Sequence, residues 1–293
     1  MALTFQRMDG KMLHLNNSSQ KNNGESIATT SLQPMGFTDI LDTTFNLFRN
    51  SFRLFFSICT VYFFFHVAFS AFAHHEGVQI FSDVAVLVLC YWALTFASAQ
   101  AVLKRHITPR IAFRQVKRRF WPLLGSSLLY WLVFVSLSVT IIGIPFAIYF
   151  FTRWSFNAQA VMIEETSATN ALRRSRELVK GSWWRVFGIT FAIFLLSIVI
   201  ELILTTSSTF IFALSGIAGK INLLEMILHT MPNDEIEGTW HLLHAVHTAI
   251  EALIMPITAI GFTLLYFDLR IRKEGFDIEM KIAKDEVKEY LKP

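Results

Sequence analysis

The chain has 293 residues, of which 53% are hydrophobic and only 16% are charged. A soluble domain carries about 25% charged residues, and the deficit here accompanies several apolar runs of about 20 residues, the length at which a helix crosses a bilayer core of about 30 Å. The composition therefore excludes an ordinary soluble domain and predicts an all-α, polytopic membrane protein.

The two ends of the chain are polar. Residues 1–36 are rich in Asn and Ser and contain no apolar segment of the signal-peptide type, so we expect a disordered cytoplasmic tail. Residues 273–293 are expected to form a second, charged cytoplasmic tail. The two cysteines, Cys59 and Cys90, fall inside apolar runs and are expected to be small buried hydrophobes rather than a disulfide pair.

The membrane domain is expected to cover residues 37–272 and to contain six transmembrane helices. The expected spans are 54–73, 78–103, 122–142, 145–163, 186–206 and 241–267, with an outer cap at 207–240. Only HHEG separates the first two spans, and only Gly143-Ile144-Pro145 separates the next two, so the spans are expected to pair as three hairpins.

The distribution of positive charge predicts the orientation. Lys and Arg gather on the cytoplasmic side of membrane proteins. With both termini inside and six spans, every Lys and Arg except Arg153 and Lys220 falls in a cytoplasmic segment or at its border. Because this topology accounts for the basic residues, their number does not indicate nucleic-acid binding.

Each expected hairpin follows a short basic and aromatic segment, at residues 37–56, 107–124 and 167–188. We expect three cytoplasmic amphipathic helices at the membrane interface, with basic side chains on the phosphates of anionic lipids. Alternatively, basic and aromatic residues can lie at the inner membrane interface of any protein built from helical hairpins, without forming a repeated structural unit. The candidate interface residues are Arg173, Arg174, Arg176, Lys180, Trp183, Trp184, Arg118, Arg119 and Trp121.

Three of these stretches resemble a known family. ILDTTFNLFRNSFRLFF, RRSRELVKGSWWRVFGI and FTLLYFDLRIRKEGFDIE are similar to the bacterial membrane domain found on some glycerophosphoryl diester phosphodiesterases. The resemblance covers residues 35–280 and implies a bacterial plasma-membrane location and a role as an anchor. The phosphodiesterase activity is not implied, because a catalytic barrel needs about 250 residues and the last span is followed by a short tail only.

Ionisable residues inside the expected spans suggest a polar site, because such residues are costly in lipid. They are Arg153, Glu251, Glu201 and Asp83. Their depths along straight helices predict that Arg153 pairs with Glu251. The pair would either form a site for an anionic headgroup or a proton path, or fix the packing of two helices.

Histidines near the outer ends of the expected spans form a second candidate cluster. The candidate zinc ligands are His241, His244, His247, Glu251, His74 and His75. On a helix, His244, His247 and Glu251 can share one face, and His and carboxylate side chains suit zinc. The spacing matches no established metal motif, so the same histidines can simply hydrogen-bond between helices, and no cofactor is expected.

Three functions follow from these observations. The first is a non-catalytic membrane anchor or scaffold that binds protein partners, which agrees with the missing catalytic motifs. The second is a transporter or lipid-handling protein with its site near Arg153 and Glu251. The third is a metal-dependent membrane enzyme that uses the outer-face histidines.

Overall fold

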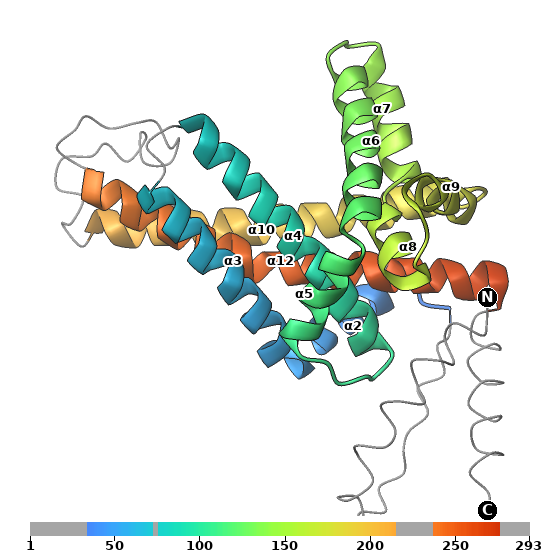
Figure 1. The fold of residues 1–293 in the computed structure, drawn as a ribbon, viewed down its shortest axis with the longest axis horizontal. Helices are drawn as coiled ribbons and strands as arrows, with labels where there is room; N and C mark the ends of the chain where they lie inside the picture. Colours follow the sequence, from blue (N-terminus) through green and yellow to red (C-terminus); the bar gives the residue numbers. More distant parts are fainter. Residues whose placement is uncertain (1–33, 73–75, 215–236, 276–293) are drawn as a thin grey trace, which may run out of the picture. The chain divides into compact units, whose positions relative to one another are not determined.

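The computed structural model describes residues 34–72, 76–214 and 237–275, and every element in these ranges is an α-helix (Figure 1). The helices are α2 (Phe37–Asn50), α3 (Phe52–Phe72), α4 (Glu76–Val102), α5 (Pro109–Arg118), α6 (Phe120–Ser138), α7 (Gly143–Arg153), α8 (Asn157–Glu164), α9 (Ala168–Val179), α10 (Trp183–Leu214) and α12 (Glu237–Glu274).

Several of these helices are long and apolar enough to cross a membrane. In the described ranges, four qualify: Phe81–Val102, Phe120–Ser138, Trp183–Phe212 and His244–Glu274. A fifth is reached if α2 and α3, which meet at an 80° bend, count as one broken span. The all-helical, polytopic fold class therefore agrees with the structure, whereas six spans are not found.

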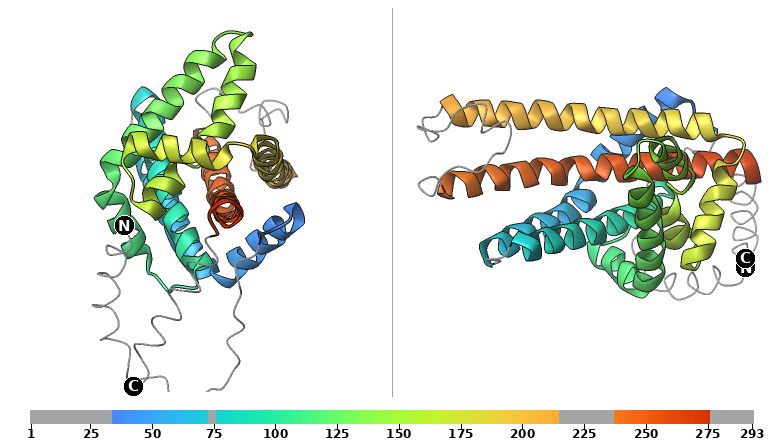
Figure 2. Two further views of the ribbon diagram at one scale, coloured as in Figure 1. Left: turned by 90° about the vertical axis from the view of Figure 1, so that its right-hand side faces the viewer. Right: turned by 90° about the horizontal axis from the view of Figure 1, so that it is seen from above.

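The central helix of the bundle is α12. It packs against α3 and α4 and, on another side, against α10, and Figures 1 and 2 show these four helices running alongside one another. In its apolar stretch 83% of residues are buried, against 11% for α6. Gly261 permits the close approach to α10, because a Cβ there would lie 2.9 Å from the side chain of Ile193. Groups on α12 are therefore shielded by helices from several sides.

The third and fourth expected spans have a different structure. α6 and α7 form a hairpin that runs across the direction of the other long helices (Figures 1 and 2). The expected span 145–163 is wrong, because the helix breaks between Arg153 and Asn157 and leaves α7 only 11 residues long. A helix of that length covers about 16 Å, which is half of a bilayer core of about 30 Å.

The break after α7 is stabilised by Ser175 of α9. The Ser175 hydroxyl donates to the carbonyl of Arg153 at 3.0 Å and accepts from the backbone N–H of Phe156 at 3.1 Å. These are backbone groups that a continuous helix would pair internally. Ser175 lies on the buried face of α9, whose members are Ala171, Leu172, Ser175, Leu178 and Val179.

Candidate functional site

The expected pair of Arg153 and Glu251 does not form. Arg153 is the last residue of α7, where its guanidinium donates to the hydroxyl of Tyr149 and lies over the Tyr149 ring. Glu251 lies on α12 and accepts a hydrogen bond of 2.9 Å from the hydroxyl of Tyr62 on α3. The predicted pairing is wrong because the depth of Arg153 was calculated along a straight helix, whereas α7 ends at Arg153.

A different polar chain joins α3, α4 and α12. His66 Nδ1 lies 2.9 Å from the carboxylate of Asp83, and His66 Nε2 lies 3.2 Å from His244 Nδ1. The two imidazole rings are parallel, with an interplanar angle of 1° and centroids 5.1 Å apart. His66 is only 5% exposed, so its ring nitrogens depend on these partners.

The contact between the two imidazoles depends on their tautomers. A neutral imidazole has one donor and one acceptor nitrogen. One of His66 Nε2 and His244 Nδ1 must donate and the other accept, so a single N–H proton joins the two rings. The Asp83 carboxylate lies close to His66 Nδ1, but the two atoms do not form a hydrogen bond of normal geometry.

A second polar contact lies one helical turn further along α3. Tyr62 precedes His66 by four residues, and the two rings are 6.0 Å apart. Its hydroxyl carries the contact with Glu251, so the polar groups continue from Asp83 and the histidines to this carboxylate. Cys59 and Cys90 are buried free thiols, which agrees with the expectation from sequence.

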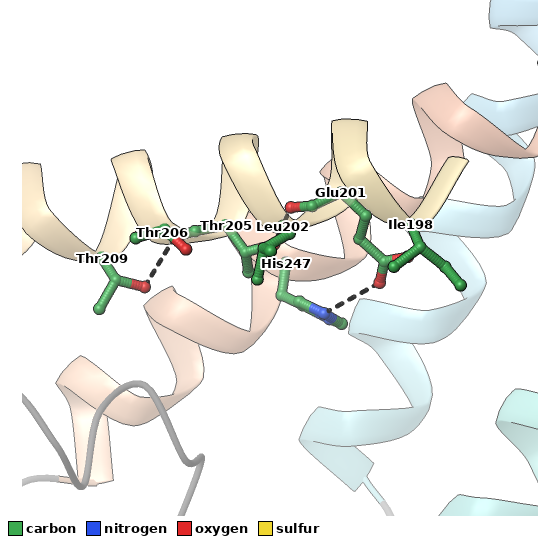
Figure 3. A pocket seen from close by; sticks show the side chains of 7 residues that line it. All are labelled: Ile198, Glu201, Leu202, Thr205, Thr206, Thr209 and His247. Carbon is green, nitrogen blue, oxygen red and sulfur yellow. Dashed lines mark hydrogen bonds and ion pairs between the residues drawn. The ribbon is translucent and has the colours of Figure 1, made fainter. Parts of the chain in front are cut away.

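On another side of α12, His247 faces α10. His247 Nε2 lies 3.6 Å from the carboxylate of Glu201 (Figure 3). The two residues border a cavity of about 290 Å³ that Ile198, Leu202, Thr205, Thr206 and Thr209 also line. The hydroxyls of Thr205 and Thr209 donate to carbonyls of their own helix, so they face the groove as acceptors.

The histidines of α12 therefore turn to different neighbours, with His244 facing α3 and His247 facing α10. In the described part of the chain, no three His, Cys, Asp or Glu side chains gather closely enough to hold a metal ion. His74, His75 and the side chain of His241 lie outside the described residues, so the zinc hypothesis remains untested.

At the opposite end of α12, Asp268 organises a cluster that the sequence did not predict. Its carboxylate is fully buried and accepts from the backbone N–H of Met35 at 2.8 Å, from Arg185 at 2.9 Å and from Arg272 at 3.0 Å. Both arginines also donate to the carbonyl of Met35. The only sequence signal was the spacing of four between Asp268 and Arg272.

A second ionic cluster lies beside it and changes the interpretation of α9. Arg174 donates to Glu164 at 2.7 and 2.9 Å and to Glu274 at 2.7 Å. Burial lowers the pKa of the Arg174 guanidinium, but hydrogen bonds to Glu274 and Glu164 and their charges outweigh burial and raise that pKa above its ordinary value. Arg174 is thus engaged within the protein rather than with lipid.

The other expected interface residues divide into two groups. Arg119 pairs with Glu165, Arg173 pairs with Glu177 at 2.9 Å, and Trp183 stacks on Phe187 at 5.1 Å. Arg176, Lys180 and Arg118 are exposed, and their side chains form no ion pair in the described part of the chain. Trp121 and Trp184 are exposed as well, although each contacts an aromatic ring. These five side chains are exposed enough to meet lipid headgroups.

Comparison of the chain with protein-family models, with curated proteins and with solved structures finds no match. The resemblance to the phosphodiesterase membrane domain therefore stays a prediction, and the function has to be argued from the geometry.

Proposed function

We propose that the protein is a multi-pass plasma-membrane protein that transports protons, with both termini in the cytoplasm. The observation that supports it best is the chain Asp83–His66–His244, which lies among apolar helices. Ionisable residues are costly in lipid and typically mark ion or proton pathways. Two adjacent imidazoles joined by an N–H proton are groups between which a proton can pass.

The groups around the chain come from each helix that packs on it. α3 supplies Tyr62 and His66, α4 supplies Asp83, and α12 supplies His244 and Glu251. Apart from Tyr62, this set consists of two carboxyl groups and two imidazoles, and it includes no Lys or Arg. Carboxyl and imidazole groups can both bind and release protons, which is what a proton path requires.

The groove at Glu201 and His247 suits a positively charged substrate. Its lining offers one carboxylate and threonine acceptors and contains no Lys or Arg. An ammonium group would find a charge partner in Glu201, whereas an anionic headgroup would be repelled. The sequence predicted an anionic headgroup because Arg153 was expected at the site. Arg153 lies on α7 instead, so the substrate class proposed for this groove changes from anion to cation.

The test is proton flux in liposomes that contain the purified protein and an internal pH-sensitive dye. Under an imposed pH gradient, the wild type should dissipate the gradient faster than empty liposomes. Asp83→Asn and His66→Gln should each slow the flux by at least about tenfold, because each removes a positioned proton donor or acceptor. Glu177→Gln is the matched control, since it neutralises an exposed carboxylate on α9 and should leave flux unchanged.

Wild-type liposomes that hold their gradient as long as empty ones would overturn the proposal. The alternative is then the scaffold, which the ionic clusters around Asp268 and Arg174 favour because they hold α8, α9, α10 and α12 together. A protein partner that co-purifies in stoichiometric amount from native membranes, together with absent flux, would support that function.

A further inference from the structure

The helix α5 carries an exposed row of uncompensated positive charge. Arg110, Arg114, Lys117 and Arg118 are all exposed, and α5 contains no acidic residue. Among the described residues, none of these four side chains forms an ion pair. Like charges three and four residues apart on a helix repel one another modestly, and an anion that lies against them removes this cost.

The geometry of α5 directs these charges outward. Ala112 and Val116 are buried in the hydrophobic core beside α4, and they fix the inner face of the helix. The cations occupy the remaining faces. Each is therefore held at the surface by a helix that cannot rotate without exposing its apolar side.

The chemistry next to α5 is that of a lipid surface. Trp121, three residues beyond the last of these cations, is 77% exposed, and Leu132 further along α6 is 66% exposed. Exposed aliphatic side chains on a candidate span face lipid tails, and Trp is enriched where tails meet headgroups. The row of cations thus lies at the level of the headgroups, beside a tail-facing helix.

We propose that α5 and Trp121 form a binding site for anionic phospholipid headgroups. The phosphates would lie against Arg110, Arg114 and Lys117, while the lipid tails would lie along α6. The sequence predicts this role for all three interface segments, and the structure favours α5 over α9, because α9 commits Arg173 and Arg174 to carboxylates of the protein. The inference does not depend on proton transport.

The test measures the affinity of phosphatidylglycerol for the full chain in neutral detergent, with native mass spectrometry as readout. Arg110→Gln, Arg114→Gln and Lys117→Gln are combined, and the affinity should fall at least about tenfold, since each basic residue near an anionic surface adds to the binding free energy. A variant that combines Arg110→Lys and Arg114→Lys keeps the charge and should retain most of the affinity.

The control variant combines Arg173→Gln, Arg176→Gln and Lys180→Gln, which removes the same number of charges from α9. Its affinity should fall less than threefold, at about the level of a general charge effect. An equal loss in both triple variants would overturn the proposal, because net charge alone would then explain binding. Equal affinity for phosphatidylcholine, or displacement by millimolar inorganic phosphate, would also overturn it.

Discussion

Asp268 illustrates how much of the fold depends on a single carboxylate. It is fully buried, and three groups from distant parts of the chain donate to it: the backbone of Met35, Arg185 on α10 and Arg272 on α12. If the charge of Asp268 were removed, both arginines would remain partly buried but would lose their charged partner. A partly buried charge without a partner destabilises a protein more than replacing both members of the pair does.

Asp268→Asn should therefore lower the free energy of unfolding by about 2 kcal/mol, the usual cost of losing hydrogen bonds to a charged group. Unfolding in mixed micelles of increasing SDS content measures this change. Glu177→Gln disrupts an exposed pair instead and should cost less than about 0.5 kcal/mol. If the two variants unfolded alike, Asp268 would have no special structural role.

Single residues were the hardest feature to predict from the sequence. The ionisable residues Asp83, Glu201 and Glu251 were identified correctly as polar groups within apolar helices, because charge in such runs is conspicuous. Their partners were not identified. Tyr62 and His66 look like ordinary members of an aromatic-rich segment, and only the packing of α3 on α12 shows that they face Glu251 and His244.

At the scale of elements, the hairpin of α6 and α7 depends on Gly143. Its backbone N–H donates to the carbonyl of Thr140 at 3.0 Å, and a Cβ at this position would overlap the carbonyl oxygen of Leu137. Gly188 lies within α10 and has open space beside it, since no atom lies within 4 Å of a Cβ added at this position.

Gly143→Ala should destabilise the protein by about 1–3 kcal/mol, because the turn must open to admit the methyl group. Gly188→Ala should be neutral or stabilise by up to about 1 kcal/mol, the difference in helix propensity. Thermal unfolding in detergent, followed by circular dichroism, compares the two. A tolerated alanine at position 143 would mean that the turn is looser than the structure shows.

Element positions could be predicted better than their lengths. For example, Thr108 precedes α5 and Pro109 is its first residue, and both residue types are common at helix starts. The break after Arg153 was not predicted, because residues 146–163 contain no Gly or Pro to mark a helix end, although polar residues gather there: Thr152, Arg153, Ser155, Asn157 and Gln159. It depends on the side chain of Ser175, which is distant in sequence.

At the scale of the whole molecule, the direction of this hairpin decides the topology. Its tip is strongly apolar, with Ile141 87% and Ile142 82% exposed, yet α7 is too short to cross the bilayer core. We expect the hairpin to enter lipid and return on the same side, which would remove two of the six spans predicted from the sequence and leave the expected orientation of the termini unchanged.

Ile142→Cys tests this in a background with Cys59→Ala and Cys90→Ala. In intact cells, a membrane-impermeant maleimide should leave position 142 unlabelled, because the tip lies within lipid, and solubilisation in detergent should restore labelling. Arg173→Cys on α9, which we expect to face the cytoplasm, should react with the maleimide once the cells are permeabilised. Labelling of position 142 from outside would restore the six-span topology.

The hydrogen bonds that hold the backbone of Met35 also have a mechanical consequence. Asp268, Arg185 and Arg272 hold the N–H and the carbonyl of this residue, so the chain is fastened where it enters α2. Asp268 and His244 lie on the same continuous helix, separated by about 36 Å of α12. Pro256 lies between them and removes one backbone hydrogen bond from α12, so a displacement at Met35 reaches His244 only through a helix that can bend near its middle.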